Sequence, residues 1–111
     1  MISNAPNVQD FLKKTVTDNT IVLFMKGTAQ FPQCGFSGKA IALLKQCGAK
    51  DIVTFNVLSD DDVRQGIKTF SNWPTIPQLY IQGEFIGGSD IMNELFEQGE
   101  LQTLVAQVSQ A

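Results

Sequence analysis

A chain of 111 residues with 43% hydrophobic content suits one domain with its own core, which we expect over residues 1–111. The chain has no histidine, which excludes Ser-His-Asp catalysis and His-ligated zinc from its own residues. A net charge of -3 with singly scattered lysines argues against nucleic-acid binding, and the longest apolar run, residues 21–25, is far too short to span a membrane.

The first half of the chain predicts a helix, a buried strand and a second helix. Apolar residues at helical spacing indicate an amphipathic helix over about residues 7–18. The segment TIVLFMKG, residues 20–27, is typical of a buried strand because its five consecutive apolar residues are partly β-branched. After the loop TAQFPQ, residues 36–47 carry apolar side chains on one side, and Gly48 predicts the end of that helix.

The second half predicts a strand at 51–58, a helix at 59–70, a hairpin at 78–88 and two helices at 89–99 and 100–108. The expected hairpin turn is Gln82 and Gly83, and the expected N-caps are Ser59 or Asp60 for the third helix and Ser89 or Asp90 for the fourth.

The order of these elements predicts an α/β fold. A strand-helix-strand unit implies a parallel pair with a right-handed crossover, and the hairpin adds two antiparallel strands to the same sheet. We therefore expect a four-stranded mixed sheet flanked on both faces by helices. Ligands of such sheets usually bind beyond the carboxyl ends of the strands, where Cys34 follows the first strand.

The motif CGFS, Cys34 to Ser37, resembles a dithiol motif in which Ser37 replaces the second cysteine. A cysteine at a helix N-terminus meets free backbone N–H groups and the positive end of the helix dipole, and both favour the thiolate. The dipole contributes only about 0.3 to 1 kcal/mol, so a larger pKa depression needs a cation, for which Lys26 is the candidate. The alternatives are an inert buried thiol at Cys34 and a solvated lysine at Lys26.

Cys47 is the only other cysteine, and helix geometry separates it from Cys34. A helix over residues 36–47 is about 17 Å long at 1.5 Å per residue, whereas a disulfide needs Cα atoms within about 7 Å. We therefore predict no intrachain disulfide and interpret Cys47 as a core cysteine. Two thiols without a disulfide partner indicate a reducing compartment, the cytoplasm, or an organelle matrix if a presequence has been removed.

Two further loops are expected beside Cys34. In NWPTIPQLY, a cis Ile76-Pro77 bond would leave the Ile76 backbone free to pair with an extended peptide, although an ordinary turn would use the same residues. In IGGSD, backbone N–H groups converge at a helix N-terminus, where Ser89 and Asp90 could bind a carboxylate and an amine, although the same residues suit a plain capped helix. Together with Lys26, these groups suit a small peptide with a thiol, such as glutathione.

These motifs occur in an order and spacing that resemble the single-domain monothiol glutaredoxins of the CGFS type, which have a thioredoxin-like fold. The resemblance runs from about Val8 to the last helix and includes KGT, PQCGFS, NWPTIPQLY and GEFIGGSD. It implies a glutathione site whose contacts are Lys26, Arg64, the Ile76 backbone, Ser89 and Asp90. Arg64 alone would be interpreted as an exposed helix residue, so its assignment depends on the resemblance.

The resemblance also implies binding of a [2Fe-2S] cluster for storage, transfer or assembly. Such a cluster needs four ligands, usually thiolates, so Cys34 as metal ligand and one glutathione per chain would supply all four in a homodimer. The family's partners include BolA-type proteins, which could supply the histidine that this chain lacks, and iron-sulfur recipient proteins.

The second hypothesis is a glutathione-dependent thiol oxidoreductase in which Cys34 is the catalytic nucleophile. A third is an adaptor that works mainly through its partners. Many family members have a cysteine where this chain has Ser89, and that cysteine can resolve an oxidised active-site thiol. Ser89 closes that route here. The long TAQFPQ loop could orient glutathione in favour of the cluster.

Overall fold

The structure is a computed structural model that describes residues 5–109. Its elements are α1 (Ala5–Asp18), β1 (Ile21–Met25), α2 (Gly35–Gln46), β2 (Val53–Asn56), a 3-10 turn (Val57–Ser59), α3 (Asp61–Ser71), β3 (Gln78–Ile81), β4 (Glu84–Gly87), α4 (Ser89–Glu97) and α5 (Glu100–Ser109). Every helix and strand predicted from the sequence is present among the described residues, and most bounds differ by one or two positions.

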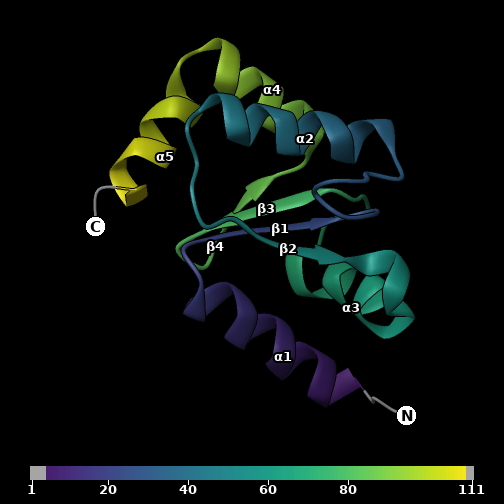
Figure 1. Ribbon diagram of the computed structural model, residues 1–111. Coiled ribbons are helices and arrows are strands. Elements are labelled where there is room, and N and C mark those ends of the chain that lie inside the picture. The colour runs from purple at the N-terminus through teal and green to yellow at the C-terminus, as the bar shows by residue number, and fades with distance from the viewer. Residues whose placement is uncertain (1–4, 110–111) are drawn as a thin grey trace.

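The four strands form one mixed sheet in the order β2-β1-β3-β4. β1 pairs parallel with β2 through α2, and β3 pairs antiparallel with both β1 and β4. Helices α2, α4 and α5 lie over one face of the sheet, and α1 and α3 lie over the other (Figure 1). The predicted mixed sheet with helices on both faces is confirmed, and the architecture is the thioredoxin-like one.

Two hydrophobic clusters, one on each face of the sheet, hold these layers together. Alternate residues of β1 point to opposite faces, so Leu23 packs in the cluster beneath α2 and α4, whereas Phe24 packs in the cluster beneath α1 and α3. All five residues of β1 are buried, which explains why this strand is a continuous apolar run. The chain continues from the carboxyl end of this buried central strand to Cys34, so the strand provides a rigid base for that segment.

The ends of three elements differ from the sequence prediction. β2 ends at Asn56 because the Asn56 side chain accepts hydrogen bonds from the backbone N–H groups of Gly27 and Leu58, which turns the chain into the 3-10 turn. α2 ends at Gln46, and Gly48 follows with a φ of +79°, one position beyond the C-cap residue. The prediction of Ser89 or Asp90 as N-cap of α4 is wrong, because Gly88 occupies that position and both residues lie in the first turn.

Other local predictions are confirmed. Asp60 is the N-cap of α3 and accepts a hydrogen bond from the backbone N–H of Val63 at 3.2 Å. Gln82 and Gly83, with φ of +53° and +81°, form the turn between β3 and β4, as expected for a tight hairpin turn that needs positive φ at both positions.

Candidate functional site

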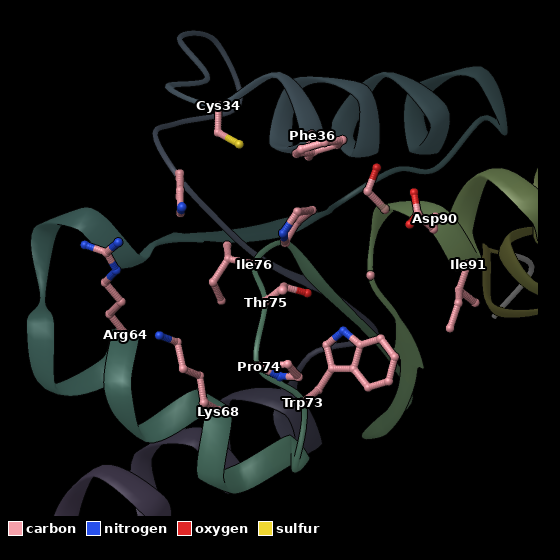
Figure 2. A pocket seen from close by; sticks show the side chains of 14 residues that line it. Cys34, Phe36, Arg64, Lys68, Trp73, Pro74, Thr75, Ile76, Asp90 and Ile91 are labelled. Atoms are coloured by element: carbon pink, nitrogen blue, oxygen red, sulfur yellow. The ribbon is translucent and has the colours of Figure 1, made fainter.

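A groove of about 480 Å³ lies at the end of the sheet where β1 ends, between α2, α3 and the start of α4. All six residues that the sequence indicated line it: Lys26, Cys34, Arg64, Ile76, Ser89 and Asp90. Figure 2 shows Cys34 and Phe36 on the α2 side, Arg64 and Lys68 on α3, and Asp90 and Ile91 on α4. The fold therefore gathers residues from four separate parts of the sequence around one space.

Cys34 is the N-cap residue of α2, with extended backbone geometry, and its side chain is partly exposed. Its sulfur makes no cap hydrogen bond, but the backbone N–H of Ser37 lowers the pKa of the thiol, helped by the N–H of Phe36 and the charge of Lys26 against the opposing effect of burial. The sequence analysis expected a cation to produce any large depression. The structure gives the larger role to the backbone of the first helical turn.

Ser37, at the position of a second cysteine in a dithiol motif, is completely buried. Its hydroxyl accepts a hydrogen bond from the backbone N–H of Lys26 at 3.0 Å. That bond joins the first turn of α2 to the end of β1 and fixes Cys34 relative to Lys26. The sequence analysis treated Ser37 only as a missing thiol, and no pattern of residue types could have revealed its partner eleven positions away.

The 27–33 loop between β1 and Cys34 has a defined fold of its own. Thr28 and Phe31 bond reciprocally: the Thr28 N–H donates to the Phe31 carbonyl at 3.2 Å, and the Phe31 N–H donates to the Thr28 hydroxyl at 3.0 Å. Gln33 then returns to β1, donating its N–H to the Lys26 carbonyl at 2.9 Å. At Gly27, where φ is +93°, a Cβ atom would lie 2.5 Å from the Gln33 nitrogen, so only glycine fits. The loop exposes 74% of Phe31, which lies three residues before Cys34 in the sequence.

The basic side of the groove carries three cations. Lys26 leaves the end of β1, and Arg64 and Lys68 project from α3. Lys68 was missed in the sequence analysis, although its position four residues after Arg64 places both on the same face of a helix. The three side chains make this end of the groove suited to an anionic group.

The opposite end is formed by the N-terminus of α4. The N-cap residue, Gly88, has no side chain that could accept hydrogen bonds from the first N–H groups of the helix. These N–H groups lie at the groove together with Ser89 and Asp90. A Cβ atom on Gly88 would lie 3.2 Å from the Pro77 carbonyl oxygen and 3.4 Å from the Trp73 indole nitrogen, so glycine lets the 73–77 loop pack tightly against the helix start. This end combines N–H donors for an anion with a carboxylate for an amine.

The 73–77 loop forms the wall between these two ends. Its residues Trp73 to Pro77 all line the groove, and the expected cis Ile76-Pro77 bond is present. The Ile76 side chain is 8% exposed and packs with the cluster beneath α1 and α3, so the loop is anchored there. None of the hydrogen bonds between described residues uses the Ile76 amide or carbonyl, which leaves that backbone available to an extended ligand.

Cys47 occupies the C-cap position at the other end of α2. It is a free thiol, half-buried against the cluster beneath α2 and α4, and burial raises its pKa. Both cysteines are free, as the helix geometry predicted.

Two features are absent from the described residues. No three His, Cys, Asp or Glu side chains among residues 5–109 gather into a potential metal site. Within the same range, no helix combines the length and the apolar character that crossing a bilayer requires.

Comparison with known proteins assigns a family to this arrangement. The family model described as Glutaredoxin matches residues 21–86. An uncharacterized ycf64-like monothiol glutaredoxin of Synechocystis sp. is 50% identical over 100 residues, which cover 90% of this chain and 92% of that protein. The mitochondrial monothiol glutaredoxin-5 of Schizosaccharomyces pombe is 52% identical, covering 88% of this chain and 68% of that protein. The solution structure of reduced poplar apo GrxS14 superposes with a TM-score of 0.80 at 47% identity, covering 96% of each chain.

Proposed function

Because the chain belongs to the glutaredoxin family and resembles its monothiol members, we propose that it binds glutathione in the groove and carries a [2Fe-2S] cluster between two copies of itself. The observation that carries the proposal is Cys34: a single partly exposed cysteine, with a lowered pKa, at the mouth of a groove whose charges match a small peptide.

The groups of glutathione match those of the groove. An extended ligand whose thiol lies beside Cys34 can pair its backbone with Ile76 and place one carboxylate toward Arg64. Its second carboxylate then meets the N-terminus of α4, and its amine meets Asp90. A volume of about 480 Å³ lies within the range of small-molecule sites.

Counting sulfurs explains why two copies would be needed. A [2Fe-2S] cluster takes four ligands, and each chain offers one partly exposed thiol of lowered pKa at the groove. The thiol of a bound glutathione adds a second, and a twofold-related copy completes the set. Phe31 and Phe36, which precede and follow Cys34 in the sequence and expose 74% and 62% of their surface, provide an apolar surface for that second copy. The cluster is cargo, stored or passed on to recipient proteins.

The test is anaerobic reconstitution with iron and sulfide, with and without glutathione, followed by absorbance and sizing. The proposal predicts a coloured dimer only with glutathione and a colourless monomer after the cluster is removed. A colourless monomer in every condition would contradict the proposal.

A second function, glutathione-dependent reduction of mixed disulfides, is favoured by the lowered pKa of Cys34. The Cys34 thiolate would attack the glutathione sulfur of a glutathionylated protein, forming a Cys34-glutathione disulfide and releasing the protein thiolate. A second glutathione would then attack that disulfide, releasing glutathione disulfide and restoring Cys34. Rapid turnover of such a substrate by a protein that forms no cluster would make this the main function.

Partners and compartment follow from the same chemistry. A BolA-type protein could replace one copy and supply a histidine ligand, since this chain has none. The relatives include proteins named mitochondrial, from Schizosaccharomyces pombe, and chloroplastic, from Arabidopsis thaliana. We propose a reducing compartment for this chain, the cytoplasm or an organelle matrix.

A further inference from the structure

The 73–77 loop supplies the Ile76 backbone to the groove but lies outside every helix and strand. Its conformation must therefore be held by contacts with its surroundings. Trp73 begins the loop and is joined to the end of α3, where its N–H donates to the Lys68 carbonyl at 3.2 Å and to the Ser71 hydroxyl at 3.1 Å. These bonds fix only the start of the loop.

The middle of the loop is held by Gln78, the first residue of β3, whose side chain is completely buried. Its amide nitrogen donates to two loop carbonyls, those of Trp73 and Thr75, both at 3.1 Å. Both N–H groups of the carboxamide thus donate to the same short segment, to carbonyls that are two residues apart. The second of these carbonyls belongs to the residue immediately before Ile76.

The orientation of this carboxamide is set from its other side. The Tyr80 hydroxyl donates to the Gln78 side-chain oxygen at 3.1 Å, and Tyr80 lies two residues along the strand, on the same face. A flipped amide would direct its oxygen at two carbonyl oxygens, which repel it, so only the observed orientation satisfies all three bonds. Burial raises the pKa of Tyr80 to about 12, so this hydroxyl stays a donor throughout the neutral pH range.

We infer that Gln78 is a positioning residue of the groove: its buried carboxamide, oriented by Tyr80, holds the 73–77 loop in the conformation that presents the Ile76 backbone to the ligand. Gln78 does not line the groove itself. Release of the loop would also disturb the end of the groove that α4 forms, because Trp73 packs against Gly88 at the start of that helix. The effect on glutathione depends on the proposed function, whereas the effect on the loop does not.

The test uses Gln78→Met, which keeps the length of the side chain and removes all three hydrogen bonds. Trp73 is the only tryptophan of the chain and is 38% exposed, so its fluorescence quenching by acrylamide reports on the loop without any ligand. We expect stronger quenching, together with binding of glutathione weakened about tenfold, or about 1.4 kcal/mol, by calorimetry. The pKa of Cys34 should stay unchanged, because Ser37, Phe36 and Lys26, which lower it, take part in none of these three hydrogen bonds.

Two controls separate positioning from general loss of stability. Val105→Ala removes buried volume in α5, in the hydrophobic cluster on the other face of the sheet from Ile76 and Tyr80, and should lower the melting temperature without changing Trp73 quenching or glutathione affinity. Tyr80→Phe keeps the ring and removes only the hydroxyl, so it should show a smaller change of the same kind, and it decides the matter if Gln78→Met does not fold.

Unchanged Trp73 quenching in Gln78→Met, or in Tyr80→Phe where Gln78→Met does not fold, would overturn the inference. An equal change of quenching in Val105→Ala would overturn it as well. If the wild-type protein binds no glutathione, the proposed function fails, and the quenching comparison alone still decides whether Gln78 holds the loop.

Discussion

The two cysteines of this chain occupy the N-cap and C-cap positions of one helix, and their environments shift the thiol pKa in opposite directions. Cys34, the N-cap of α2, has its pKa lowered chiefly by the backbone N–H of Ser37, whereas burial raises the pKa of Cys47, the C-cap. A groove with three cations adjoins the first, and packed hydrophobic side chains adjoin the second. The thiol pKa of the same residue type is therefore lowered at one end of the helix and raised at the other.

The most severe test of this comparison removes each sulfur in turn. In Cys34→Ser, we expect complete loss of glutathione-dependent cluster binding, because Cys34 is the one cysteine among the residues that line the groove. In Cys47→Ser, the matched substitution at the other end of α2, cluster content should stay at the wild-type level. Absorbance and bound iron after anaerobic reconstitution measure both. Equal loss in the two variants would show that the ends are not functionally different.

A second test uses pH to compare the thiols directly. Alkylation requires the thiolate, so lowering the pH should slow Cys47 first and leave Cys34 reactive to a lower pH. Each unit between the two pKa values gives about a tenfold difference in thiolate fraction, which the weaker nucleophilicity of the low-pKa thiol partly offsets. Peptide mass spectrometry of iodoacetamide-treated protein over a pH series measures both rates. A higher inflection pH for Cys34 would reverse the comparison.

A third test concerns exposed aromatic side chains rather than the sulfurs, and compares the loop before Cys34 with the opposite side of the sheet. Phe31→Ser should weaken the cluster-bridged dimer about tenfold, since burying a phenylalanine side chain is worth about 1.5 to 3 kcal/mol when complete. Phe11→Ser is the matched control: Phe11 is also exposed, at 42%, but lies on α1, across the sheet from α2 (Figure 1). Dilution followed by sizing measures the dissociation. Equal weakening by both variants would remove Phe31 from the interface.

The sequence predicts the positions of the elements and of the site well, because both depend on local patterns. Apolar runs and turn residues such as Gln82 and Gly83 fix the strands, and the parallel crossover brings the carboxyl ends of β1 and β2 together, which places Cys34 at the groove. Arg64 also lines the groove, but it was expected there only from the family resemblance. The roles of Ser37 and Gln78 could not be predicted in this way. Each depends on one hydrogen-bond geometry between a buried side chain and the backbone of another segment, which no periodicity records.

A fourth test asks what in the first turn of α2 lowers the pKa of Cys34. Ser37→Pro removes the backbone N–H that has the largest effect, and proline is tolerated in the first turn of a helix. Ser37→Ala is its control, because it keeps the N–H and loses only the hydroxyl, which accepts from the Lys26 backbone and makes a smaller contribution of its own to the lowered pKa. We expect the thiol pKa, measured by thiolate absorbance, to rise clearly more in Ser37→Pro than in Ser37→Ala. Equal shifts would assign the effect to the hydroxyl.

The smallest expected effect belongs to the cation that the sequence alone made prominent. Lys26→Gln removes a charge from a partly exposed position, where a pairwise interaction is worth about 0.2 to 1 kcal/mol, so the pKa of Cys34 should rise by less than about one unit. Raising the salt concentration should shrink this difference between variant and wild type but leave the Ser37→Pro shift in place, because a fixed N–H dipole beside the sulfur is screened less than a solvated charge. A shift in Lys26→Gln larger than that in Ser37→Pro would return the main role to the lysine.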